Sequence, residues 1–178
     1  MKNNKQENID KDTSKEHKKD APTSIGFSII TVSDSRTIND DVSGRVIKEL
    51  IQKQTHRVIH HVVVKDDKKD IKSAINKILC DKEIGIIITN GGTGIAPCDV
   101  TIEAVEPFFE KKISSFSPLF SKLSFEAIGS PALLSRATAG IAKGKAIFCL
   151  PGSPRACSLA VEKLILPEAG HIMKHLGD

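Results

Sequence analysis

The sequence contains neither tryptophan nor tyrosine, and all seven of its aromatic residues are phenylalanine. A nucleic-acid surface that stacks bases on tyrosine and tryptophan rings is therefore disfavoured. No stretch approaches the roughly 18–20 uninterrupted apolar residues that a membrane span needs, and the N-terminus is lysine-rich where a signal peptide would be apolar. These absences predict a soluble, cytoplasmic protein with no nucleic-acid and no membrane partner.

The sequence also lacks a large excess of charge of either sign, since it has 26 basic and 22 acidic residues and a formal net charge of +4. A nucleic-acid binder would cluster its basic residues on one face, and here it would depend on the lysine-rich N-terminus and bind with a steep salt dependence. The four cysteines form no C-x-x-C pair and no metal-binding spacing with histidine, which predicts reduced thiols. They are Cys80, Cys98, Cys149 and Cys157.

The 178 residues fit one domain behind a short tail. Residues 1–22 contain Ile9 as their only branched aliphatic residue and cannot bury enough apolar surface to offset the entropy lost on ordering. We therefore predict a disordered charged tail at 1–22 and a single folded domain at 23–178.

In the domain, short β-branched runs alternate with stretches of helical period. Strands are predicted at Ile25–Val32, Arg57–Val64, Ile84–Thr89 and Lys145–Leu150. Helices are predicted at Val42–Lys53, Asp70–Cys80, Asp99–Lys111 from an Asp99 N-cap, with helical or mixed structure on to Phe125, and Ser153–Leu166 from a Ser153 N-cap. The alternation predicts a three-layer α/β/α domain with a mainly parallel sheet covered on both faces.

Ligands of open parallel sheets bind beyond the carboxyl ends of the strands, so the residues after each strand are the candidates for a site. Ser33–Arg36 is either a polar turn closed by Asp34 or Ser35, or part of a site. Lys65–Asp70 taken alone is a solvated charged loop. Gly152–Pro154 delivers a helix N-terminus, where Arg155 opposes the helix dipole unless an anion binds there.

The strongest signal follows the third predicted strand, at Thr89–Asp99. Gly91, Gly92 and Gly94 allow positive φ angles and a close approach of the backbone, so successive N–H groups can cradle an anion. The spacing matches neither a dinucleotide fingerprint nor a Walker A loop. It therefore indicates phosphate binding of another kind.

Carboxylates at these strand ends bear on whether a metal ion binds together with the phosphate. Asp99 is either a helix N-cap or, with Glu103 one turn later, part of a Mg²⁺ site. With Asp34 and Asp66 at two other strand ends, the pattern favours magnesium and a phosphate ester over a hydrolase triad. The histidines of the domain lie away from the glycine loop, so each is interpreted as a packing or surface residue rather than a general base.

With these residues assembled, the chain resembles the MogA/MoaB family of molybdenum cofactor biosynthesis proteins, and within it the MoaB members most. The resemblance runs from Ser24 to Leu176. It rests on five stretches in combination: Thr31–Arg36 (TVSDSR), Asn90–Gly94 (NGGTG), Pro97–Ala104, Leu134–Gly140 (LSRATAG) and Leu150–Pro154 (LPGSP).

The resemblance implies a molybdopterin-binding α/β fold, assembled as a homotrimer or homohexamer. It also implies adenylylation of molybdopterin by ATP with Mg²⁺, and other molybdenum cofactor enzymes as partners. Because some MoaB proteins resemble the family without adenylyltransferase activity, the alternative is a non-catalytic molybdopterin-binding or scaffold protein.

By motif, Asp66 and Asp99 match the two aspartates on which function in the family depends. Asp99 is assigned to catalysis or magnesium, Asp66 to catalysis or nucleotide positioning, and Glu103 to the surroundings of the magnesium. The resemblance places the nucleotide and phosphate at Ser33, Asp34, Gly91, Gly92, Thr93 and Gly94, and the pterin or phosphate side at Ser135, Arg136, Gly152, Ser153 and Pro154. The chain departs from many relatives at Cys98, a position that is often basic, and at Lys65, which is often proline.

Overall fold

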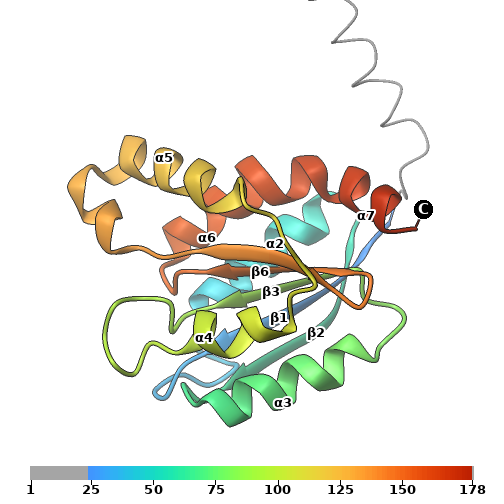
Figure 1. Cartoon of the computed structure of the whole chain (residues 1–178), viewed down its shortest axis with the longest axis horizontal. Coiled ribbons are helices and arrows are strands. Elements are labelled where there is room, and N and C mark those ends of the chain that lie inside the picture. Colours follow the sequence, from blue (N-terminus) through green and yellow to red (C-terminus); the bar gives the residue numbers. More distant parts are fainter. Residues whose placement is uncertain (1–23, 178) are drawn as a thin grey trace, which may run out of the picture.

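The computed structural model describes residues 24–177, so the tail predicted at 1–22 lies outside the described residues. One six-stranded sheet runs through the domain, with helices on both of its faces (Figure 1). The strands are β1 Gly26–Val32, β2 Arg57–Val64, β3 Ile86–Asn90, β4 Lys111–Lys112, β5 Thr138–Ala142 and β6 Lys145–Leu150. The α-helices are α2 Val42–Lys53, α3 Lys68–Leu79, α4 Thr101–Val105, α5 Phe116–Ile128, α6 Pro154–Ala160 and α7 Ala169–Gly177.

The sheet has the strand order β2-β1-β3-β6-β5-β4. β2, β1, β3 and β6 are parallel, whereas β5 and β4 are antiparallel to their neighbours. The chain passes from β1 outward to β2 and then back to β3 on the other side of β1. The order therefore reverses between β1 and β3, which is where open α/β sheets bind their ligands.

Alternate residues of the central strands point into two hydrophobic cores, as in a sheet covered on both faces. Phe27 and Ile29 of β1 pack on the face covered by α2, α5, α6 and α7, whereas Ile30 and Val32 pack on the face of α3 and α4 (Figure 1). The four predicted strands and the three-layer α/β fold are thus confirmed.

The helix predicted at Asp99–Lys111 was wrong in its start and in its length. α4 covers only Thr101–Val105, and no side chain caps it, because the Asp99 carboxylate instead accepts the N–H of Ala96 at 2.9 Å. Pro107 has no N–H to continue the helix, so the chain turns through a 3₁₀ segment at Glu106–Phe108 and enters β4.

Other boundaries differ less. α3 begins at Lys68 rather than Asp70, because the Asp67 carboxylate accepts the N–H groups of Lys69 and Asp70. Ser153 caps α6 as predicted, with Pro154 at the first position. The helix runs on through a π turn at Val161–Ile165 and a 3₁₀ turn at Leu166–Glu168 into α7. Further 3₁₀ residues, Ser130–Leu134, follow α5.

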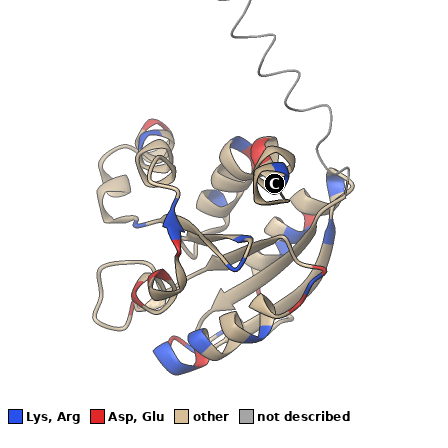
Figure 2. Cartoon of the chain, turned by 45° about the vertical axis from the view of Figure 1, so that its right-hand side comes forward, with Lys and Arg blue, Asp and Glu red and all other residues tan. Residues whose placement is uncertain are grey.

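No helix within residues 24–177 is long and apolar enough to cross a membrane. Basic and acidic residues are interspersed over the helices and loops, while the ribbon of the central strands is largely free of them (Figure 2). All four cysteines are unpaired, with Cys149 and Cys157 buried and Cys80 and Cys98 exposed. Burial raises the pKa of the Cys149 and Cys157 thiols to about 12, so both are inert neutral groups at neutral pH.

Candidate active site

The segments that follow β1, β2, β3 and β6 lie together at one edge of the sheet. Backbone hydrogen bonds join the start of two of these segments to the last residue of a neighbouring strand. They run from Ser33 N to Val64 O at 2.9 Å and from Gly91 N to Leu150 O at 3.1 Å. The beginnings of these loops are therefore fixed by backbone hydrogen bonds between parallel strands.

The glycine loop after β3 has no room for side chains at its first two positions. Gly91 and Gly92 have φ angles of 93° and 59°, in the region that favours glycine. A Cβ on Gly91 would lie 2.3 Å from Val32 O, and one on Gly92 would lie 2.4 Å from Thr101 Oγ1. The same threonine hydroxyl donates a hydrogen bond to Gly91 O at 2.8 Å. The loop thus presents bare backbone at the strand ends, as a phosphate cradle requires.

Two aspartates flank this loop. A Cβ built on Gly92 would lie 2.6 Å from Asp66 Oδ1, and one on Gly94 would lie 2.6 Å from Asp99 Oδ2. Asp34 joins them, because its Oδ1 accepts the backbone N–H of Asp66 at 3.1 Å. Burial raises the pKa of Asp66, and the negative charges of Asp99 and Asp34 raise it further. The structure therefore concentrates negative charge where the sequence predicted it.

This charge fits a divalent cation. Asp66 Oδ1 is buried without a hydrogen-bond partner in the protein, which is the state expected of a ligand oxygen. Within residues 24–177 no group of three histidine, cysteine or carboxylate side chains converges closely enough to hold a metal alone. Mg²⁺ does not need one, since it is typically bound by one or two carboxylates and the phosphates of the substrate.

Arg136 holds the far side of the glycine loop. Its Nε donates to Thr93 O at 3.0 Å and to Gly94 O at 2.9 Å, and its Nη1 forms an ion pair with Glu103 Oε1 at 2.6 Å. The hydrogen bond from Arg136 lowers the pKa of Glu103. Glu103, expected beside a magnesium ion, is thus bound to the arginine, and one arginine ties α4 to the loop.

The turn after β6 lies directly against the glycine loop. A Cβ on Gly152 would be 3.2 Å from Gly91 Cα, so the two backbones are nearly in contact. Ser153 Oγ accepts the N–H of Ala156 at 3.1 Å and is thereby used as the helix cap. Arg155 is exposed.

Two predicted positions have other surroundings. The turn after β1 is closed by neither Asp34 nor Ser35, because the Ser33 hydroxyl accepts the N–H groups of Ser35 and Arg36. Ser135 borders a shallow hollow beside α5, with Phe125 among the lining residues, rather than the glycine loop. The structure therefore brings the predicted strand-end loops together, whereas Ser135 lies at the hollow beside α5.

Sequence reasoning missed a buried polar network behind the site. The Asp41 carboxylate accepts hydrogen bonds from the Thr31 hydroxyl and from Gly44 N, and it contacts His61 Nε2 at 2.8 Å. Asn90 Nδ2 donates to Thr31 Oγ1 at 2.9 Å, which extends the network to the residue before the glycine loop. The sequence signal for this network is Asp41, an aspartate at the start of a helix.

Sequence reasoning also missed Ser43, which lies in the first turn of the helix that Asp41 caps. Its hydroxyl donates to Gly152 O at 2.7 Å and so connects the first turn of α2 to the loop after β6.

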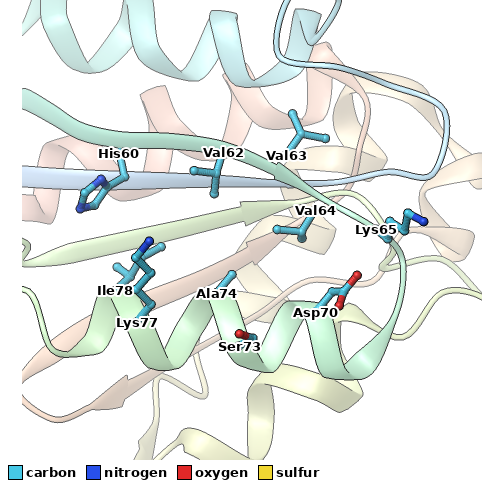
Figure 3. Close-up of a pocket in the computed structure, with 10 residues that line it drawn as sticks. All are labelled: His60, Val62, Val63, Val64, Lys65, Asp70, Ser73, Ala74, Lys77 and Ile78. Atoms are coloured by element: carbon cyan, nitrogen blue, oxygen red, sulfur yellow. The ribbon is translucent and has the colours of Figure 1, made fainter.

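A cavity of about 450 Å³ lies between β2 and α3. Figure 3 shows Val62, Val64 and Ala74 among the residues that line it, with Lys65 and Asp70 at one end. Because Lys65 precedes Asp66, this end of the cavity borders the candidate site.

Comparison with known proteins identifies the family of the chain. A family model described as "Probable molybdopterin binding domain" matches residues 28–171, which include every strand end discussed above. Molybdenum cofactor biosynthesis protein B of Bacillus cereus is 46% identical over 158 residues, which cover 88% of this chain and 94% of that protein. The chain belongs to the MoaB family.

Solved structures of the MoaB family have the same fold. A crystal structure of Molybdenum cofactor biosynthesis protein B superimposes with a TM-score of 0.85 at 44% identity, covering 88% of this chain and 98% of that one. The tungsten cofactor synthesizing protein MoaB from Pyrococcus furiosus superimposes with a TM-score of 0.81 at 36% identity, covering 89% and 100%. The resemblance inferred from the motifs is confirmed, and the chain is a molybdenum cofactor biosynthesis protein of this family.

Proposed function

We propose that the chain adenylylates molybdopterin with Mg-ATP in the cytoplasm. The observation that carries this proposal is the pair Asp66 and Asp99, whose carboxylates lie beside Gly92 and Gly94 of one glycine-rich loop. An enzyme that joins two phosphate groups needs a place where anions approach backbone N–H groups and a cation offsets their repulsion. The strand-end arrangement supports this proposal, because the glycine loop would offer the N–H groups and the two carboxylates would hold the cation.

In the proposed reaction, an oxygen of the terminal phosphate of molybdopterin attacks the α-phosphorus of ATP. A new P–O bond forms, the bond from the α-phosphorus to the bridging oxygen of the β-phosphate breaks, and pyrophosphate leaves with that electron pair. The substrate supplies the nucleophile and the attacking phosphate is already ionised. The protein therefore needs no general base, which agrees with the absence of histidine from the described glycine loops.

The residues of the chain would act by position and charge. The backbone N–H groups of Gly92, Thr93 and Gly94 would receive phosphate oxygens, since the Gly91 N–H already donates to Leu150 O, and Arg136 would keep this loop in shape through its bonds to Thr93 O and Gly94 O. Asp66 and Asp99 would hold Mg²⁺, which when bound neutralises phosphate charge. Asp34 would keep the Asp66 loop in register by accepting its N–H.

Incubation of the full chain with molybdopterin, ATP and Mg²⁺ tests the proposal, with adenylylated pterin and pyrophosphate as the products measured. We expect both in equal amounts, and none when Mg²⁺ is replaced by EDTA. A chain that binds molybdopterin tightly but forms no product would be the non-catalytic binding or scaffold protein of the alternative. A chain that neither binds nor reacts would contradict both.

We further propose that the chain assembles as a homotrimer or homohexamer. The support is an apolar surface on α5 and the 3₁₀ segment after it, where Leu119, Phe125, Ile128, Leu133 and Leu134 are exposed, Leu133 to 87%. Such clusters mark protein interfaces more often than free surface. Light scattering coupled to size exclusion should give three or six times the chain mass, and a monomer would contradict the proposal.

A further inference from the structure

Two histidines on α7 face each other on the outside of the domain. His171 and His175 are one helical turn apart, and their Nε2 atoms are 2.9 Å from each other. The His171 side chain is 34% exposed and His175 is exposed, so solvent reaches the pair. Neither residue belongs to the strand-end site.

A carboxylate sets the orientation of the first imidazole. Glu168 Oε2 lies 3.1 Å from His171 Nδ1, so this nitrogen carries a proton and donates it to the carboxylate. The lone pair of His171 is thereby placed on Nε2, where it faces His175. A carboxylate behind one ring nitrogen, with the lone pair on the other, is the usual arrangement around a metal-bound histidine.

We propose that His171 and His175 form a binding site for a divalent transition-metal ion, which takes the place of the proton between their Nε2 atoms. The ion binds both nitrogens, and water molecules complete its coordination. Glu168 acts as a positioning residue that holds the His171 ring. This site is chemically unlike the oxygen-rich environment of Asp66 and Asp99, and it does not depend on the proposed function.

The distance between the two Nε2 atoms favours some metal ions over others. With metal–nitrogen bonds of about 2.0–2.1 Å, a 2.9 Å separation corresponds to an angle of about 90° at the ion. Square-planar and octahedral ions such as Cu²⁺ and Ni²⁺ prefer this angle, whereas tetrahedral Zn²⁺ prefers a wider one. We therefore expect Cu²⁺ to bind most tightly, then Ni²⁺, with Zn²⁺ weaker than both.

Calorimetric titration of the full chain with CuCl₂, NiCl₂ and ZnCl₂ in a non-chelating buffer tests the site. We expect one tight equivalent of Cu²⁺ or Ni²⁺, and an affinity at least about tenfold lower in either His171→Ala or His175→Ala, because a single imidazole loses the chelate advantage. The electron paramagnetic resonance spectrum of the Cu²⁺ complex should show coupling to both imidazole nitrogens in the wild type and to one in each variant.

Matched controls separate this pair from other histidines. His60→Ala removes an exposed histidine on β2 that contacts Asp81, and His17→Ala removes the one in the N-terminal tail, and neither should change the affinity. Glu168→Gln should weaken binding by about tenfold while both ligands remain. Absence of binding by the wild type, unchanged binding after His175→Ala, or tighter binding of Zn²⁺ than of Ni²⁺ would overturn the proposal.

Discussion

Replacement of Asp99 by asparagine is expected to lower the rate of the proposed molybdopterin adenylylation by about 10²–10³-fold. Asparagine keeps an oxygen that can accept the Ala96 N–H, so the loop retains its shape, while the charge beside Gly94 is lost. Molybdopterin affinity should change little, because in the proposed reaction the Asp99 carboxylate would act on the developing phosphate charge rather than on the bound pterin. Initial rates of adenylyl transfer and equilibrium pterin binding together measure the effect.

The matched control for this substitution is Asp70→Asn. It removes the same charge from an exposed position in the first turn of α3, one helical turn beyond the Asp66 loop. Its rate should stay near that of the wild type. Equal losses of rate and pterin affinity in Asp99→Asn would assign Asp99 to binding or to loop structure instead.

Replacement of Asp41 by asparagine is expected to cost about 3–5 kcal/mol of the free energy of unfolding. The side chain is fully buried, and its carboxylate is shared by Thr31, Gly44 and His61. The amide cannot accept all three hydrogen bonds, so at least one buried donor loses its partner. Urea denaturation followed by circular dichroism measures the change.

Asp40→Asn is the neighbouring control, because Asp40 is exposed and caps only the turn at Thr37. The loss of stability should be much smaller there than at Asp41. Comparable urea midpoints for the two variants would show that the buried network contributes little.

The contribution of Asp41 to the free energy of unfolding should also depend on pH. Burial by itself raises the pKa of this carboxyl, but the hydrogen bonds from Thr31 and Gly44 and the contact with His61 outweigh it and hold the pKa below the ordinary value of 3.8. A lowered pKa stabilises the fold above the pKa of the unfolded chain, and this contribution is lost as the pH falls through the folded-state pKa. The difference in stability between wild type and Asp41→Asn should therefore be constant above about pH 5 and shrink below about pH 4.

The sequence predicted those parts of the fold whose local pattern agrees with their final environment. β1 and β3 are rich in β-branched residues and buried along their whole length, and α2 has one apolar stripe, so pattern and burial coincide. β5, at Thr138–Ala142, was missed because its small residues carry little strand preference. It is made a strand by pairing with β6, a contact between segments that no local pattern records.

The candidate site was predictable to the same extent. Glycines, aspartates and arginine at strand ends could be found one by one, because the parallel sheet brings such ends together. The sequence could not predict which of these residues bond to each other. Asp99 has the identity of an N-cap yet closes the loop at Ala96, and Glu103 pairs with Arg136, 33 positions away along the chain. These pairings depend on how β5 and α4 approach the glycine loop in three dimensions.

The contact between Gly152 and Gly91 has a consequence for the molecules that this edge of the sheet can select. Because only backbone separates the two loops, their spacing is set by the pairing of β3 with β6 and does not change with side-chain rotamers. Under the proposed function, a ligand that places one anionic group at each of these two loops would therefore meet a fixed spacing, and its length would matter as well as its charge.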